Sequence, residues 1–191
     1  MEKQNKRIIL ASSSPRREEL CKQAFADVLI MPQNVEEYTR YRQPWRIVTE
    51  LAERKINNLN ERFPDDFVVG ADTIVVLEKT IFGKPYDVER AIEFLELLQG
   101  KWHTVYTGVC VWHCGQKRVF FVKSFVKFNR MNATQIASYV ERKKPLDKAG
   151  AYGIQDEEVV EKYIGSYSNI VGLPMEKLVE NISQMENICK K

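Results

Sequence analysis

Cysteine and histidine are scarce in this chain, with four cysteines and two histidines among 191 residues. Cys21, Cys110, Cys114 and Cys189 do not suggest the disulfide framework of a small secreted domain, so we expect free thiols and no cross-links. A zinc site built from Cys110, His113 and Cys114 is disfavoured, because the two cysteines do not form a C-x₂-C knuckle and no second pair of ligands lies close by.

Long apolar runs are also missing. The apolar stretch near the start covers only residues 8–12, which is too short for the core of a signal peptide and for a membrane span of roughly 20 residues. We therefore expect a cytoplasmic protein with no membrane partner.

The chain lacks a strong excess of either charge, since 29 Lys+Arg against 26 Asp+Glu give a net charge of +3. Overall electrostatics therefore do not imply a nucleic-acid partner. Lys, Arg and Phe alternate in residues 117–128 as in some RNA-binding strands, but a half-buried strand explains this pattern better, and we expect no nucleic-acid partner.

Repeats and low-complexity segments are absent as well, which excludes solenoids and arrays. The chain is 44% hydrophobic and 29% charged, values typical of a folded globular protein. At this length, residues 1–191 are expected to form a single domain with two lobes.

Apolar residues follow alternating strand and helix patterns, which indicates an α/β fold. The predicted strands cover residues 7–11, 28–31, 67–77, 103–112 and 119–129, and the last two are joined by a turn at 114–116. The predicted helices cover residues 15–24, 45–62, 88–99 and 132–142, and a last one runs from Pro174 through Ile182. The glycine-rich residues 149–155 are expected to bring the backbone close to a neighbouring group.

The most informative local pattern is Ser-Ser-Ser-Pro-Arg-Arg at residues 12–17. Ser14 and Pro15 mark a helix start, so Arg16 and Arg17 fall in the first turn, where they oppose the positive end of the helix dipole. A bound anion reverses this cost, because free N–H groups, serine hydroxyls and guanidinium groups all bind phosphate oxygens. The pattern favours a phosphate site, and the alternative is a solvated arginine pair beside an ordinary serine cap.

Asp72 follows an apolar run and a Gly-Ala pair, so we expect it at the carboxyl end of a strand, where open α/β sheets bind their ligands. Its carboxylate could bind a metal ion, act as a general base or cap a turn. Glu36, Lys55 and Lys84 are ambiguous alone, because most glutamates and lysines are solvated. Their interest depends on whether they converge with Arg16 and Asp72.

Six short motifs occur in one order: SSSPRREEL at residues 12–20, GADT at 70–73, GKP at 83–85, HTVYTGV at 103–109, DKAGAYGIQ at 147–155 and GLP at 172–174. Together they resemble the Maf proteins, nucleoside triphosphate pyrophosphatases also called septum-formation inhibitors, over residues 8–178. The resemblance implies a Maf/inosine-triphosphatase-like α/β fold, with a long, curved mixed β-sheet flanked by helices and a cleft between two lobes.

The resemblance also implies a reaction, in which a nucleoside triphosphate is cleaved between its α and β phosphates with a divalent cation, Mg²⁺ or Mn²⁺. Asp72 would be the base that readies the attacking water, or a metal ligand that helps to do so, and Glu36 would join it at the metal. Lys84 and Lys55 would hold the triphosphate. The remaining phosphate-binding residues implied by the motifs are Ser12, Arg16 and Arg17. Phosphoryl chemistry relies mainly on such positioning and charge neutralisation.

Base choice in this family is associated with three positions, which here are Arg16, Thr73 and Gln155. This set resembles the dTTP/UTP pyrophosphatase branch, and a glutamine amide can both donate to and accept from the edge of uracil or thymine. Two alternatives stay open: a 7-methyl-GTP pyrophosphatase, and a non-catalytic nucleotide-sensing regulator of cell division. The resemblance further suggests a homodimer, although the sequence shows no interface pattern.

Two departures from the family pattern stand near the DKAGAYGIQ motif. Many members have Glu-Pro where this chain has Lys144-Pro145, and the glycine usual after Gly-Ile-Gln is Asp156. An aspartate is costly there only if the backbone needs a positive φ. We expect these changes to affect the rim of the substrate site more than the chemistry.

Overall fold

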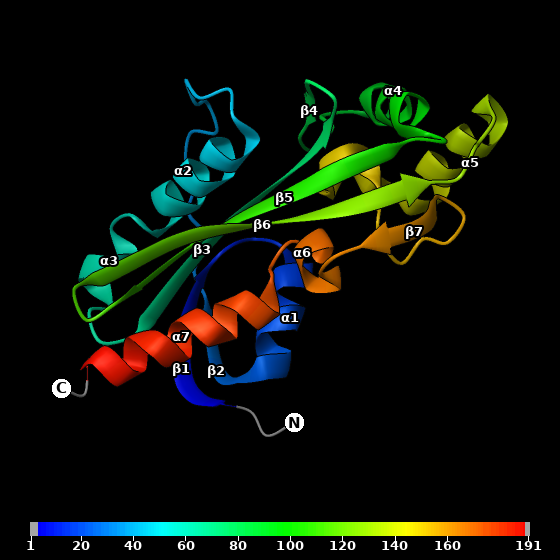
Figure 1. Cartoon of the computed structure of the whole chain (residues 1–191). Coiled ribbons are helices and arrows are strands. Elements are labelled where there is room, and N and C mark those ends of the chain that lie inside the picture. The colour runs from blue at the N-terminus through cyan, green and yellow to red at the C-terminus, as the bar shows by residue number, and fades with distance from the viewer. Residues whose placement is uncertain (1–3, 190–191) are drawn as a thin grey trace.

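The computed structural model describes residues 4–189, and in this range one mixed sheet contains seven strands (Figure 1). They are β1 (Gln4–Ala11), β2 (Phe25–Ile30), β3 (Phe67–Leu77), β4 (Thr80–Phe82), β5 (Trp102–His113), β6 (Gln116–Phe128) and β7 (Val160–Ile164). The order is β2-β1-β3-β5-β6-β7, and β4 pairs with β3. β1 lies parallel to β2 and β3, whereas all other pairs are antiparallel. The expected mixed α/β fold is confirmed.

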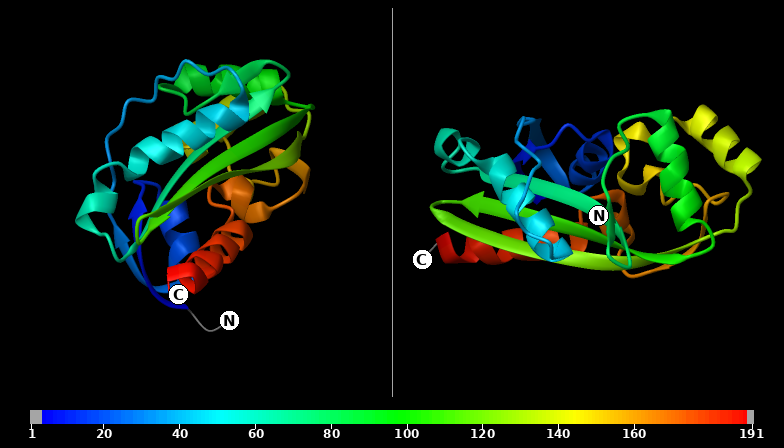
Figure 2. Two further views of the ribbon diagram at one scale, coloured as in Figure 1. Left: turned by 60° about the vertical axis from the view of Figure 1, so that its left-hand side comes forward. Right: turned by 90° about the horizontal axis from the view of Figure 1, so that it is seen from above.

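Helices cover both faces of this sheet. They are α1 (Pro15–Ala24), α2 (Pro44–Ile56), α3 (Leu59–Arg62), α4 (Val88–Leu98), α5 (Ala133–Lys143), α6 (Tyr167–Val171) and α7 (Met175–Cys189), with the short 3₁₀ turns η1 (Pro145–Asp147) and η2 (Ala149–Ala151). Figure 1 shows α2 on one side of the long strands and α1 and α7 on the other, and Figure 2 shows how the strands run the length of the molecule.

Alternate residues of β3 supply the core on each face, as expected from the two-residue period of a strand. Val68 packs in a cluster with Ile56 of α2, whereas Val69 packs in a different cluster with Ile182 of α7. A third cluster, which includes Leu95 of α4, fills the opposite end of the sheet around α4 and α5.

Helix α2 lies unusually close to the sheet because two glycines face it. A Cβ on Gly70 would be 2.3 Å from the Ala52 carbonyl oxygen, and a Cβ on Gly108 would be 2.3 Å from the Val48 carbonyl oxygen. Both distances are far below van der Waals contact, so only glycine fits at either position. Gly108 is the register partner of Asp72, and this close approach brings the last turn of α2 to that aspartate.

Several predicted elements need correction. The helix expected over residues 45–62 is broken at Asn58, which has a left-handed φ of 68° and separates α2 from α3. β2 begins at Phe25, directly after α1, rather than at residue 28. The short elements β4, β7 and α6 were not predicted, because three to five residues carry too little periodicity for recognition.

The position predicted for Asp72 is wrong in one respect. Asp72 lies in the middle of β3 rather than at its end, since β3 continues to Leu77. It is the parallel neighbour β1 that stops here, because Ala11 pairs with Gly70 and is the last residue of β1. Asp72 therefore still lies beside the carboxyl end of a parallel strand, where ligand sites of α/β sheets are found.

Two of the cysteines are buried in the core. Burial raises the pKa of the Cys21 and Cys110 thiols to about 12, so both are uncharged at neutral pH. The side chain of Cys189 lies outside the described residues. Among residues 4–189, no helix combines the length and the hydrophobicity that a bilayer span requires.

Candidate active site

A cavity lies beside Asp72, bordered by α1, α2, β3 and the turns η1 and η2. Its charged lining consists of the cations Arg16, Arg17, Lys55 and Lys84 and the carboxylates Glu37, Asp72 and Asp147. A second cavity shares Arg17, Glu37, Lys55 and Lys84 with the first and is also lined by Ser12. The structure thus gathers most of the residues singled out in the sequence, although they come from separate segments of the chain.

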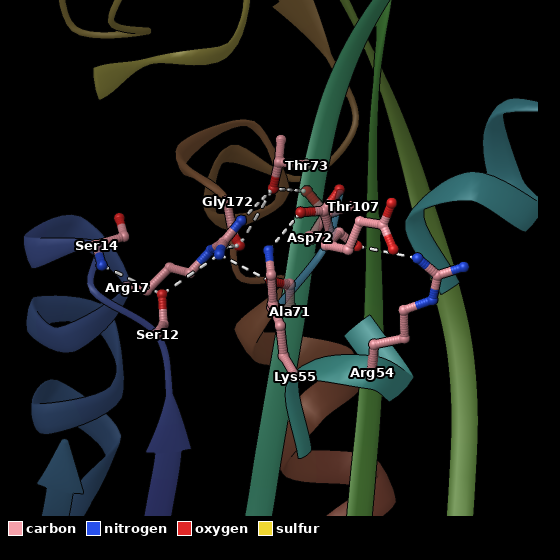
Figure 3. Close-up of polar contacts among 11 residues, drawn as sticks. Ser12, Ser14, Arg17, Arg54, Lys55, Ala71, Asp72, Thr73, Thr107 and Gly172 are labelled. Carbon is pink, nitrogen blue, oxygen red and sulfur yellow. Dashed lines mark hydrogen bonds and ion pairs between the residues drawn. The ribbon is translucent and has the colours of Figure 1, made fainter. Parts of the chain in front are cut away.

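Asp72 and Lys55 form a direct ion pair on the α2 face of β3 (Figure 3). Lys55 Nζ lies 2.5 Å from Asp72 Oδ1 and also donates to the Ala71 carbonyl oxygen at 3.4 Å. The two side chains are only 13% and 10% exposed. Asp72 Oδ2 accepts no hydrogen bond from the described residues, so one carboxylate oxygen is oriented by Lys55 while the other is available to a ligand.

Arg17 uses its guanidinium group to join α1 to the rest of the protein (Figure 3). Its Nε donates to the Gly172 carbonyl oxygen at 2.8 Å, Nη1 to the Ala71 carbonyl oxygen at 2.8 Å and to Ser12 Oγ at 3.3 Å, and Nη2 to Thr73 Oγ1 at 2.9 Å. Most of its five N–H donors are therefore occupied by the protein itself. The geometry makes Arg17 a structural link between α1 and β3.

Thr73 belongs to the same network on the opposite face of β3. Its hydroxyl accepts from Arg17 and lies 3.0 Å from the hydroxyl of Thr107, which donates to the Asn169 carbonyl oxygen at 2.9 Å. Because Thr107 has only one hydroxyl hydrogen and gives it to Asn169, Thr73 is the donor in the Thr73–Thr107 bond. The Thr73 hydroxyl is thus held in one orientation by protein groups.

Fewer of the N–H donors of Arg16 than of Arg17 are hydrogen-bonded to the protein. Its Nη2 donates to the Asp147 carbonyl oxygen at 3.3 Å and lies 3.8 Å from the Asp147 carboxylate. Its Nε is buried and has no hydrogen-bond partner among the described residues. Burial lowers the pKa of Arg16, and the charge of Asp147 opposes this effect. A buried donor without a partner in a cavity is suited to an anionic ligand.

Lys84 carries positive charge without a bonded partner. It lies in the loop after β4 and makes no hydrogen bond or ion pair with the described residues. Its pKa is lowered, first by burial and then by the positive charges of Arg17 and Lys55. Binding of an anion between these groups would relieve their mutual repulsion.

Glu36, the predicted partner of Asp72, does not line the cavity, and its neighbour Glu37 does. Glu36 and Glu37 are both exposed, and the Glu36 carbonyl oxygen accepts from Arg54 Nη1 at 2.9 Å. The same Nη1 donates to the Tyr38 carbonyl oxygen at 2.6 Å. Arg54 therefore fixes the backbone on both sides of Glu37. A pair of adjacent glutamates gives no sequence signal that distinguishes the two.

The donor set suits a hard divalent cation that is bound jointly with phosphate. No group of three or more His, Cys, Asp or Glu residues is arranged to hold a metal within the described range. Asp72 and Glu37 both line the cavity, and Mg²⁺ is usually bound through one or two carboxylates plus substrate phosphates. The residues present therefore fit an Mg²⁺ or Mn²⁺ ion that is held jointly by the protein and the substrate phosphates, rather than by protein ligands alone.

Gln155 is the second predicted residue that the structure does not bring into the cavity, since it is exposed and does not line it. Tyr152, three residues earlier, does line the cavity, and its hydroxyl lies 2.9 Å from Nε2 of the buried His103. Neither Tyr152 nor Asp147 was singled out in the sequence as a separate site residue. Their only signal was their position in the glycine-rich DKAGAYGIQ motif.

These features define an α/β protein with a cation-rich cavity suited to a polyphosphate. Comparison with known sequences agrees, because residues 7–185 match the family described as Maf-like protein, and the chain belongs to this Maf family.

Several relatives that are named dTTP/UTP pyrophosphatase align with nearly the whole chain. A dTTP/UTP pyrophosphatase of Thermosipho africanus is 42% identical over 90% of this chain and 90% of its own length. Those of Acholeplasma laidlawii and Bacillus cereus strain G9842 are 37% and 42% identical, over 96% and 95% of this chain and 98% and 96% of their own lengths.

Proposed function

We propose that this protein is a nucleoside triphosphate pyrophosphatase that hydrolyses dTTP and UTP to the nucleoside monophosphate and pyrophosphate. The observation that carries the proposal is the convergence of four cationic side chains with Asp72 and Glu37 around one cavity. The names of the relatives support the same reaction and the same substrates.

The cationic residues bind the triphosphate. Lys84 and the partnerless Nε of Arg16 contact phosphate oxygens, and the free N–H groups at the start of α1 add donors for the same anion. Arg17 contributes its charge and fixes the cavity wall through its bonds to Ser12 and Thr73. Neutralising the phosphate charge favours the leaving of pyrophosphate.

Asp72 takes the proton of the attacking water. The oxygen of this water adds to one phosphorus of the α–β anhydride, and the bridging P–O bond breaks to release monophosphate and pyrophosphate. Lys55 holds Oδ1 of Asp72, which leaves Oδ2 to face the water. When bound, Mg²⁺ or Mn²⁺ would neutralise phosphate charge and polarise the water, and Asp72 and Glu37 are the residues that would hold it.

Base choice depends on Arg16, Thr73 and Gln155 in this proposal. The hydroxyl of Thr73 is committed to Arg17 and Thr107, so it acts by shaping the cavity wall. The side-chain amide of Gln155 is exposed, and it provides one donor and one acceptor for the edge of uracil or thymine.

The direct experiment measures pyrophosphate release from dTTP, UTP, CTP, GTP and 7-methyl-GTP with Mg²⁺ or Mn²⁺. The proposal predicts the highest kcat/KM for dTTP and UTP. Highest activity on 7-methyl-GTP would place the protein in the other branch. Binding of nucleotide without release of pyrophosphate from any of them would favour a nucleotide-sensing regulator.

Three further expectations stay proposals. We place the protein in the cytoplasm, where nucleoside triphosphates are found, and we treat residues 1–191 as one domain. The homodimer is tested by sedimentation of the purified protein, in which a mass close to 22.3 kDa indicates a monomer.

A further inference from the structure

Asp156 stands where the family usually has glycine, and it closes the turn formed by residues 153–156. Its backbone N–H donates to the Gly153 carbonyl oxygen at 3.1 Å. Its carboxylate Oδ2 accepts from the Gly153 N–H at 3.2 Å. The two ends of the turn are thus bonded in both directions. Asp156 is not among the described residues with positive φ, so an aspartate adopts this backbone without left-handed strain.

The carboxylate of Asp156 also anchors this turn to helix α5. Oδ2 accepts from the Tyr139 hydroxyl at 2.8 Å, and Oδ1 lies 2.9 Å from Lys143 Nζ. The Asp156 side chain is only 6% exposed. Burial acts to raise its pKa, but the hydrogen bonds of Lys143 and Tyr139 outweigh burial and lower it. Asp156 is therefore a buried, charged and fully bonded carboxylate.

The anchored turn directly follows a residue of the cavity wall. Tyr152, immediately before the turn, lines the cavity, while Gln155 within the turn is exposed. Asp156 thus anchors a backbone segment that begins next to the cavity wall and carries the exposed Gln155.

We propose that Asp156 is a positioning residue for the nucleotide base, which holds the turn 153–156 against Tyr139 and Lys143 of α5 and thereby fixes the direction of the Gln155 amide. This inference rests on the proposed function, because it assumes that Gln155 contacts the base. An amide fixed before binding costs less entropy to use than a mobile one, so the anchor improves recognition of the base and leaves the phosphate chemistry unchanged.

The first test compares Asp156→Ala with Glu157→Ala, which deletes the exposed neighbouring carboxylate. For Asp156→Ala we expect KM for dTTP to rise about tenfold and the preference for dTTP over CTP to fall by a similar factor, with kcat within about twofold of wild type. Glu157→Ala is expected to match wild type. If Asp156→Ala fails to fold, Asp156→Asn, which keeps the shape of the side chain, replaces it.

The second test introduces Asp156→Ala into a protein that already carries Gln155→Ala. If Asp156 acts through Gln155, the two effects on KM are not additive, and Asp156→Ala changes KM by less than about twofold once Gln155 is gone. Additive effects, or a Gln155→Ala variant with unchanged base preference, would overturn the proposal.

Hydrogen exchange separates this inference from the proposed function. Amides of residues 153–156 are expected to exchange faster in Asp156→Ala than in wild type or Glu157→Ala. Unchanged exchange overturns the anchoring whatever the activity. Faster exchange in a protein that hydrolyses no nucleotide would instead show that the turn is anchored while the proposed function is wrong, which also removes the role in base recognition.

Discussion

Lys55 Nζ and Asp72 Oδ1 are 2.5 Å apart although their residues lie on different elements, α2 and β3. The contact exists because Gly70 and Gly108 allow α2 to lie directly on the sheet. The same close packing brings a lysine otherwise typical of a solvated helix face to the aspartate that we propose as the base. Geometry of this kind distinguishes a site from a collection of charged residues.

Arg16 and Arg17 are adjacent but are expected to respond differently to lysine. Arg17→Lys keeps the charge but cannot reproduce the bonds to Gly172, Ala71, Ser12 and Thr73, so we expect the free energy of unfolding to fall by about 3 kcal/mol. Urea denaturation measures this change.

Arg16→Lys is the matched control for that experiment. It loses only one pair of contacts, to Asp147, so its stability should stay within about 1 kcal/mol of wild type while KM rises. Equal losses of stability in the two variants would contradict the division of roles between these arginines.

Glu37 and Glu36 offer a matched pair for the metal. Because Glu37 lines the cavity and Glu36 does not, Glu37→Gln should raise the Mg²⁺ concentration needed for half-maximal activity about tenfold. Glu36→Gln should leave it unchanged. A Mg²⁺ titration of pyrophosphate release measures both, and the reverse ranking would restore Glu36 as the second carboxylate.

Deprotonation of Lys84 should make the KM for the triphosphate depend on pH in the alkaline range. Its pKa lies below the ordinary value of 10.5 because of burial and the charges of Arg17 and Lys55. As the pH rises through this lowered pKa, Lys84 loses its charge, so KM for the triphosphate should rise at a lower pH than an ordinary lysine would allow.

The Lys84→Arg variant tests this cause, because an arginine stays charged and should move the rise in KM to higher pH. Lys79→Arg, at an exposed position in the turn before β4, serves as the control. A pH profile of KM that is identical in wild type and Lys84→Arg would show that Lys84 does not bind the triphosphate.

His103 makes folding sensitive to acid. Burial lowers its pKa to about 3, whereas in the unfolded chain the pKa is close to 6.5. As the pH falls from 6.5 toward 3, the unfolded chain takes up a proton that the folded protein excludes. The free energy of unfolding therefore falls by up to about 1.4 kcal/mol for each pH unit in this range.

The His103→Gln variant lacks this titration. Urea denaturation at pH 7, 5.5 and 4.5 should therefore show a smaller loss of stability on acidification in His103→Gln than in wild type, whatever the offset between them at pH 7. Equal losses of stability in the two proteins would mean that His103 is already protonated in the folded protein. Its contact with the Tyr152 hydroxyl would then involve a charged imidazolium.

Much of the fold was predictable because long elements carry clear periodicity. The strand over residues 67–77 and the helix over 15–24 match the sequence prediction. The break at Asn58 was missed because a left-handed residue leaves no mark on the pattern of apolar positions. β7 and α6 were missed because their five residues are stabilised by their neighbours rather than by local preference.

The candidate site was predictable in composition but not in detail. The family resemblance pointed to Arg16, Lys55, Asp72 and Lys84, which do share a cavity. Residue type alone did not show that Glu37 rather than Glu36 faces the cavity. That choice depends on Arg54, which binds the backbone on both sides of Glu37 from another element.

The most direct measurement is pyrophosphate release from dTTP by wild type and by Asp72→Asn in the presence of Mg²⁺. We expect release by wild type and a kcat lower by about 10²–10⁴-fold in Asp72→Asn, with nucleotide binding retained because the cationic residues are unchanged. Equal kcat values in the two proteins, or no release by either, would contradict the account.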